Sequence, residues 1–164
     1  DYPGYGNSAG KPGEKSLKQA AVASLLYLRK KYPGRKIIGA GFSLGAAVAC
    51  YLAGKHEKEI ASLILVSPWY SLHSTAAAHY PSFLVSLFMA EKYESYKSAG
   101  KYSGNVLIIH GERDTIIPVK EGIALAREFR GEVKLILQKL AGHNDIFDQT
   151  LTIAEITRFI GQIR

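Results

Sequence analysis

The sequence predicts an α/β protein in which a parallel sheet is covered by helices on both faces. Short apolar segments with β-branched residues alternate along the chain with helix-like segments, and this alternation is typical of βαβ units with right-handed crossovers. The hydrophobic content of 47% and the charged content of 21% are those of a chain that buries a core. At 164 residues, the chain has the length of one domain.

The individual elements follow from local patterns. Residues 1–13 are rich in glycine and proline, which predicts a loop. Residues 14–31 predict an amphipathic helix, because apolar side chains recur at helical spacing until Tyr32-Pro33-Gly34 ends the pattern. Buried strands are expected at residues 36–40, 60–67, 105–110 and 133–138. Further helices are expected at residues 44–53, 119–130 and 145–163.

Residues 69–103 interrupt the alternation of strands and helices. This segment contains Pro81 and many aromatic residues, and it predicts one helix near residues 82–93. A connection of this length between two sheet strands is typical of a lid or of a wall of a binding site. The chain is therefore expected to form a single α/β domain with a short lid or cap at about 69–103.

Charge and cysteine content narrow the class of protein. The net charge is +7, but the basic residues are dispersed, which favours a solvated surface over a nucleic-acid site. The single cysteine, Cys50, cannot form an intrachain disulfide, and no histidine–cysteine–carboxylate spacing indicates a metal site. No apolar run reaches the ~20 residues of a transmembrane helix. No signal peptide is recognisable, so the sequence favours the cytoplasm.

The segment Gly41-Phe42-Ser43-Leu44-Gly45 carries the strongest chemical signal. It matches G-x-S-x-G and lies between an expected strand and an expected helix, where a sharp turn presents a serine hydroxyl at the carboxyl end of the sheet. The following helix would offer its first N–H groups, beginning with that of Leu44, to a developing oxyanion. The alternative is a tight turn that merely happens to hold a serine.

A serine nucleophile needs a histidine base and an acid that orients it. Asp114 and His143 each follow an expected strand, so both lie on loops at the same sheet edge as Ser43. Their order along the chain, serine then acid then histidine, is that of α/β-hydrolases. We therefore expect these three residues to form a catalytic triad. Taken alone, Asp114 could be a turn residue and His143 a surface histidine.

Other titratable residues are weaker candidates for the same roles. Glu112 and Asp145 lie close in sequence to the expected acid and base, and they are the fallback choices for the acid. His110 precedes a glycine at the end of a strand and is expected to be structural. The sequence thus favours Asp114 as the acid and His143 as the base.

The chain also resembles the small serine hydrolases of the α/β-hydrolase superfamily, in the branch with acyl-protein thioesterase-like and serine-aminopeptidase-like members. The family motifs are D-Y-R-G-Y-G-x-S-x-G, S-P-[FW]-x-S-L and H-G-x-x-D-x-x-[IV]-P, and they match residues 1–10, 67–72 and 110–118. The resemblance implies Ser43 as nucleophile, Asp114 as acid and His143 as base. Pro3 departs from the pattern, since it stands where the family has arginine.

The resemblance implies that the chain holds strands 5–8 of a larger hydrolase sheet and lacks the N-terminal strands. The loop that gives the second oxyanion N–H in the family would then be missing, and the edge of the strand at residues 36–40 would be unpaired. We expect either a fragment of a longer hydrolase, or a half that pairs through this edge with a missing N-terminal segment or with itself. A minimal hydrolase, with residues 1–13 covering the edge, is the alternative.

The sequence therefore predicts a serine hydrolase that cleaves a carboxylic ester or thioester of a small-molecule or acyl substrate, without a cofactor. A serine peptidase on the same triad is one alternative, with Glu91 and Glu94 as candidate anchors for a chain terminus; a non-catalytic interaction module with the same fold is another. The net positive charge is also compatible with a substrate at a membrane surface. Apolar residues of the insertion are expected either to line an acyl pocket or to pack the domain: Trp69, Tyr70, Tyr80, Phe83, Leu84, Leu87, Phe88 and Met89.

Overall fold

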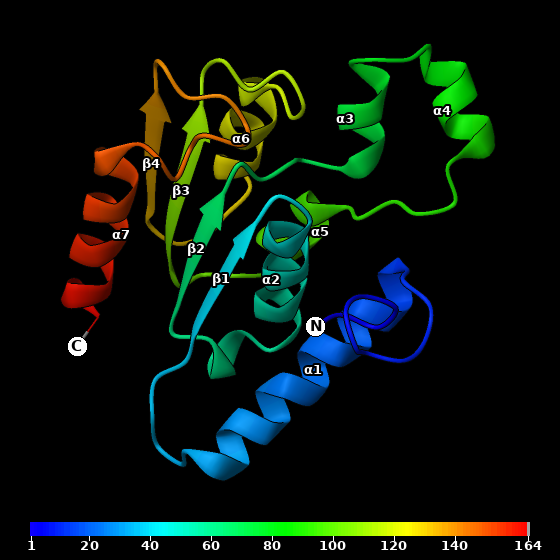
Figure 1. Ribbon diagram of the computed structural model, residues 1–164. Coiled ribbons are helices and arrows are strands. Elements are labelled where there is room, and N and C mark those ends of the chain that lie inside the picture. The colour runs from blue at the N-terminus through cyan, green and yellow to red at the C-terminus, as the bar shows by residue number, and fades with distance from the viewer. Residues whose placement is uncertain (164) are drawn as a thin grey trace.

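The computed structural model describes residues 1–163, and a four-stranded parallel sheet lies at its centre (Figure 1). The strands follow one another across the sheet in the order of the sequence. They are β1 (Ile38–Phe42), β2 (Ser62–Val66), β3 (Asn105–Gly111) and β4 (Val133–Gln138). The predicted fold class, a parallel α/β sheet, is confirmed.

Helices lie on both faces of this sheet. Helix α7 covers one face, whereas α2 and α6 cover the other, and α1 packs on the outside of α2 (Figure 1). The helices are α1 (Glu14–Lys31), α2 (Leu44–Lys55), α3 (Leu72–Ala77), α4 (Ser82–Phe88), α5 (Ser95–Ala99), α6 (Val119–Ala126) and α7 (Thr150–Gln162), with a short 3-10 turn at Glu57–Glu59. None of the helices described is long and apolar enough to cross a membrane.

The central strand β2 shows why its sequence is a continuous apolar run. Leu63 and Leu65 pack into the core beneath α2 and α6, whereas Ile64 and Val66 pack into the core beneath α7. Successive side chains of a strand point to opposite faces, so burial on both faces favours the unbroken apolar run from Leu63 to Val66. The side chains of β2 therefore contribute to two separate hydrophobic cores, one on each face of the sheet.

Several element boundaries differ from the sequence expectation. Strand β1 begins at Ile38 rather than at residue 36, because Lys36 is exposed, and it continues to Phe42, which pairs with Val66. Helix α7 begins at Thr150 rather than at residue 145. The preceding residues instead form a turn, in which the Asp145 side chain accepts a hydrogen bond from the N–H of Gly142 at 2.6 Å.

The insertion between β2 and β3 is more divided than the sequence suggested. The expected helix over residues 82–93 ends at Phe88, and two helices that were not expected, α3 and α5, flank it. Helix α3 begins at a reciprocal cap, in which the Ser71 and Ser74 side chains each accept a hydrogen bond from the other residue's N–H. Serine rather than glutamate at the last position of this motif makes the cap hard to recognise in sequence.

A buried carboxylate on α6 connects the insertion to the rest of the domain. Glu121 on α6 is only 5% exposed, and its Oε2 accepts hydrogen bonds from the N–H of Tyr70 and the hydroxyls of Ser74 and Thr75. A buried carboxylate is tolerated only where such donors surround it. Glu121 therefore links the start of α3 to α6.

Replacing Glu121 with alanine should destabilise the protein by about 2 kcal/mol, because the buried donors that face its carboxylate lose their acceptor. Urea unfolding measures this change, and limited proteolysis within residues 72–92 should become faster. Glu132→Ala, at an exposed glutamate, is the control and should unfold like the wild type. Equal midpoints for Glu121→Ala and wild type would contradict the assigned role.

Candidate active site

Ser43 lies at the turn between β1 and α2, in a backbone conformation that few residues other than glycine adopt. Its φ is 53° and its ψ is −118°. The glycine at position 41 makes this turn possible, because a Cβ on Gly41 would overlap the backbone of Gly45. The N–H of Ser43 also donates to the Val66 carbonyl at 3.0 Å, which fastens the turn to β2. The G-x-S-x-G pattern therefore reflects steric crowding as well as strain.

The His143 ring connects Ser43 to a carboxylate. Its Nε2 is 3.1 Å from Ser43 Oγ, and its Nδ1 is 2.7 Å from Asp114 Oδ2. Because an ionised carboxylate can only accept, Nδ1 carries the proton, which leaves the Nε2 lone pair facing the serine hydroxyl. The structure thus brings the three residues of the predicted triad into one hydrogen-bonded chain, from loops that are far apart in sequence.

Asp114 is buried, yet it is held in its charged form. Its Oδ1 accepts hydrogen bonds from the N–H groups of Ile116 and Ile117, at 2.9 and 2.7 Å. Burial by itself would raise the pKa of this carboxyl, but the interactions with His110, the Ile117 N–H and His143 outweigh it and lower the pKa to about 2. The carboxylate is therefore ionised at neutral pH and can stabilise a positive charge on His143.

The Phe42 ring packs against the imidazole of His143. The Phe42 ring lies with its centroid 4.8 Å from that of His143, and Phe147 packs edge-on against Phe42 at 5.4 Å. These contacts restrict the ring to the plane in which both of its nitrogens meet their partners. Phe42 is the last residue of β1, and Phe147, which packs against Phe42, lies in the loop before α7.

His110 contacts the same carboxylate, although the sequence suggested only a structural role for it. Its Nε2 is 3.4 Å from Asp114 Oδ2 and 2.9 Å from the Ile117 carbonyl oxygen. The signal that points to this contact in the sequence is the spacing of the H-G-x-x-D motif, which joins the end of β3 to Asp114 through one tight turn.

Comparison with known proteins identifies the family. A family model described as an alpha/beta hydrolase fold matches residues 1–90, which is more than half of the chain. The chain belongs to the α/β-hydrolase family. It is 32% identical to human alpha/beta hydrolase domain-containing protein 17B, over 99% of this chain and 55% of that protein. It is also 32% identical to an uncharacterized protein of Mycobacterium tuberculosis, over 98% of this chain and 58% of that protein. The chain thus spans a little over half the length of these relatives.

Solved structures of esterases and lipases have the same α/β-hydrolase fold. The Pyrococcus furiosus esterase Pf2001 matches with a TM-score of 0.78 at 24% identity, over 99% of this chain and 68% of the esterase. A Paleococcus ferrophilus monoacylglycerol lipase matches with a TM-score of 0.70 at 20% identity, over 98% of this chain and 79% of the lipase. At these identities the likeness shows the fold.

The backbone after Ser43 fits the oxyanion role predicted for Leu44. This residue is the first of α2, so its N–H is one of the donors that a helix leaves free at its N-terminus. The same end of the helix carries the positive end of the helix dipole. The site in this α/β-hydrolase chain therefore offers a donor next to the serine hydroxyl.

His143 Nδ1 is hydrogen-bonded to Asp114 and not to either fallback acid. Asp145 uses its Oδ1 to hold the Gly142 N–H, which shapes the loop that carries His143. Glu112 is exposed. Cys50 does not compete as a nucleophile, because burial raises the pKa of its thiol to about 12 and keeps it protonated. Among the residues described, no group of histidine, cysteine and carboxylate side chains could hold a metal ion.

The apolar residues of the insertion do not form the single pocket considered for them. Trp69 packs into the core beside Tyr93, whereas Phe83 and Leu87 on α4 are 68% and 72% exposed. The side chain of Phe88 lies outside the described residues.

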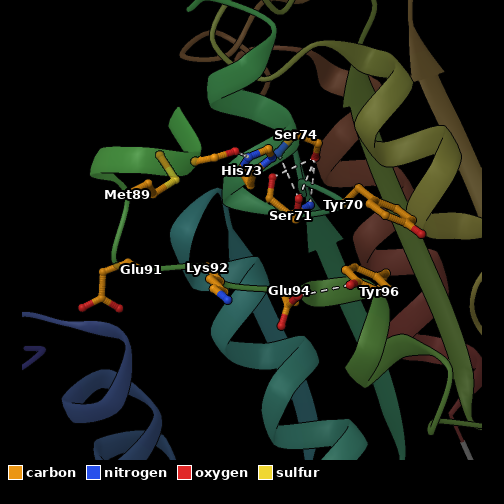
Figure 2. Close-up of a pocket in the computed structure, with 10 residues that line it drawn as sticks. Tyr70, Ser71, His73, Ser74, Met89, Glu91, Lys92, Glu94 and Tyr96 are labelled. Atoms are coloured by element: carbon orange, nitrogen blue, oxygen red, sulfur yellow. Dashed lines mark hydrogen bonds between the residues drawn. The ribbon is translucent and has the colours of Figure 1, made fainter. Parts of the chain in front are cut away.

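A cavity lies within the insertion, since every residue that lines it falls between Tyr70 and Tyr96. In Figure 2, Met89 and Glu91 lie on one side of it, and Glu94, which is bonded to Tyr96, lies on the other. Its volume is about 500 Å³, and it is lined by Tyr70, Ser71, His73, Ser74, Ser86, Met89, Glu91, Lys92, Glu94 and Tyr96. Ser43 and His143 are not among these lining residues, so the cavity is separate from the candidate active site.

Acidic pH should remove the contribution of the Asp114 carboxylate to the free energy of unfolding. Its pKa is about 2 in the folded protein, against an ordinary value of 3.8, so the contribution is present above about pH 4 and is lost as the pH falls towards 2. The difference in unfolding free energy between wild type and Asp114→Asn should therefore shrink by about 2 kcal/mol over this range. Chemical denaturation at a series of pH values measures it. Asp148→Asn, at an exposed aspartate, should show no such trend.

Proposed function

We propose that the protein is a serine hydrolase that cleaves a carboxylic ester or thioester through an acyl-enzyme. The observation that carries the proposal is the continuous chain from Ser43 Oγ to His143 Nε2, at 3.1 Å, and from His143 Nδ1 to Asp114 Oδ2, at 2.7 Å. This chain meets the geometric requirement for a general base that is itself oriented by an acid. Membership of the α/β-hydrolase family and the esterase and lipase folds agree with it.

The proposed reaction proceeds in two half-reactions. Ser43 Oγ attacks the carbonyl carbon while His143 Nε2 takes the hydroxyl proton, and the Leu44 N–H stabilises the oxyanion. The tetrahedral intermediate then collapses, and the leaving alcohol or thiol takes the proton from Nε2. A water molecule attacks the acyl-serine in the same way, with His143 again as base, and releases the acid and the free serine.

Asp114 contributes by remaining charged throughout this cycle. Its low pKa keeps it ionised while His143 is protonated, so the pair of charges is stabilised without a proton transfer between them. Its bond to Nδ1 also fixes the tautomer in which Nε2 can accept the serine proton.

The insertion is positioned to contribute to substrate binding. The His79 side chain, just after α3, is hydrogen-bonded to the carbonyl of Ile116 at 3.0 Å, which joins the insertion to the loop that holds Asp114. The next residues along the chain, among them Tyr80 and Phe83, present exposed apolar side chains. We propose that these side chains contact the acyl part of the substrate, which can be a small molecule or a lipid at a membrane surface.

A peptidase on the same triad is a weaker proposal. It would need a free acidic group for the charged end of a peptide, and Glu91 and Glu94 are both engaged elsewhere. Glu91 accepts a hydrogen bond from the N–H of Glu14, and Glu94 is paired with Lys97 at 2.8 Å. A non-catalytic module would have no need for the positive φ of Ser43, which costs conformational energy and is typical of functional sites.

Labelling with a fluorophosphonate probe tests the nucleophile. The wild type should react at Ser43, and Ser43→Ala should not react and should lose esterase turnover by about 10⁴-fold or more. Ser24→Ala, at an exposed serine of α1, is the matched control and should react like the wild type. Equal labelling of wild type and Ser43→Ala in folded protein would refute the proposal.

A substrate comparison separates the ester from the peptide hypothesis. A p-nitrophenyl ester and an acyl thioester should be turned over with a higher kcat/KM than an aminoacyl anilide, because Glu91 and Glu94, the candidate anchors for an amino group, already have other partners. Steady-state kinetics on all three substrates provide the measurement. A preference for the aminoacyl anilide would favour the peptidase.

A further inference from the structure

The end of β3 buries a histidine that the proposed reaction does not use directly. The His110 side chain is fully buried, and its Nε2 lies 2.9 Å from the carbonyl oxygen of Ile117 and 3.4 Å from Asp114 Oδ2. A carbonyl oxygen can only accept a hydrogen bond, so Nε2 must carry a proton. That proton is hydrogen-bonded to the Ile117 carbonyl, and the negatively charged Asp114 Oδ2, 3.4 Å from Nε2, also attracts it.

The other ring nitrogen of His110 faces helix α6. Among the described residues, Nδ1 has no hydrogen-bond partner, and a Cβ at Gly122 would collide with it. A second proton on Nδ1 would therefore be buried without an acceptor. The surroundings select the neutral ring with its proton on Nε2, and the absence of a side chain at Gly122 leaves the space that the ring occupies.

The two oxygens of Asp114 are held by different parts of the loop. Oδ1 is fixed by the N–H groups of Ile116 and Ile117, whereas Oδ2 lies between the rings of His110 and His143. Without His110, the inner side of Oδ2 would lose its donor, and the Ile117 carbonyl would lose its side-chain partner. The carboxylate plane would then be less restricted on the side that faces His143.

We propose that His110 is a positioning residue of the active site: its Nε2–H spans the Ile117 carbonyl and Asp114 Oδ2, and it holds that oxygen in line with Nδ1 of His143. The inference rests on the proposed hydrolase function. It extends that function by a residue that touches neither the substrate nor the nucleophile. The ring acts through Asp114, and it does so as a neutral donor rather than as a cation.

A pair of variants of similar shape tests whether the N–H of His110 is what matters. His110→Met removes the donor and should lower kcat about 10-fold while KM stays unchanged, because the donor acts on the carboxylate and not on the substrate. His110→Gln can place an amide N–H near the same position and should restore most of kcat. Equal losses in both variants, or no loss in His110→Met, would overturn the proposal.

The space at Gly122 gives a second test that leaves His110 itself intact. Gly122→Ala should displace the ring and lower kcat by a similar factor. Gly161→Ala, in α7, is the matched control, because a Cβ there meets nothing within 4 Å, and its kcat should equal that of the wild type. Wild-type kcat in Gly122→Ala would contradict the proposed contact.

Nuclear magnetic resonance of the protein with ¹⁵N-labelled histidine tests the arrangement independently of turnover. His110 should show a protonated Nε2 and an unprotonated Nδ1, and His110→Met should shift the signal of the His143 Nδ1 proton. A proton on Nδ1 of His110, or an unchanged His143 signal, would overturn the inference. If Ser43 fails to react with the fluorophosphonate while these signals appear as expected, the proposed hydrolase activity fails and the positioning of Asp114 by His110 stands.

Discussion

The buried Asp114 carboxylate is the group on which the geometry of the site depends. One of its oxygens closes the loop after β3 through the N–H groups of Ile116 and Ile117, and the other lies between His110 and His143. Because a buried charge is stable only while its donors stay in place, these contacts form and break together. The orientation of His143 therefore depends on Asp114 and, through it, on the packing of β3, α6 and the loop after β4.

The parallel register of the sheet brings the loops of the site to one edge. Phe42 pairs with Val66 and Val66 pairs with Ile109, so β1, β2 and β3 end side by side. The turn with Ser43 and the loop with Asp114 leave from this edge, and the loop with His143 follows β4 beside them. The close approach of Gly41 to Gly45 and the positive φ of Ser43 form a sharp turn, which presents the serine hydroxyl at this edge. Sheet pairing and this local steric constraint together bring Ser43 within reach of His143.

The insertion between β2 and β3 was the part least predictable from the sequence. Its helices are short, and their positions depend on contacts with distant residues: Glu121 of α6 accepts hydrogen bonds at the start of α3, and Glu14 of α1 accepts them from the N–H groups of Lys92 and Tyr93. Such contacts leave no periodic pattern in the segment itself. The apolar residues that could have lined one pocket are instead divided between the core and the exposed surface of α4.

The sequence by itself determined the alternation of strands and helices, the glycine–serine turn, and the order in which Ser43, Asp114 and His143 occur. These features are local: they follow from side-chain periodicity and from the steric demands of a tight turn. Only the tertiary structure decided that the His143 ring meets Ser43 and Asp114 at hydrogen-bonding distance, and that His110 shares the carboxylate. The physical reason is that His143 lies 100 residues from Ser43 along the chain, so the packing of the whole sheet, and not local pattern, sets the distance between them.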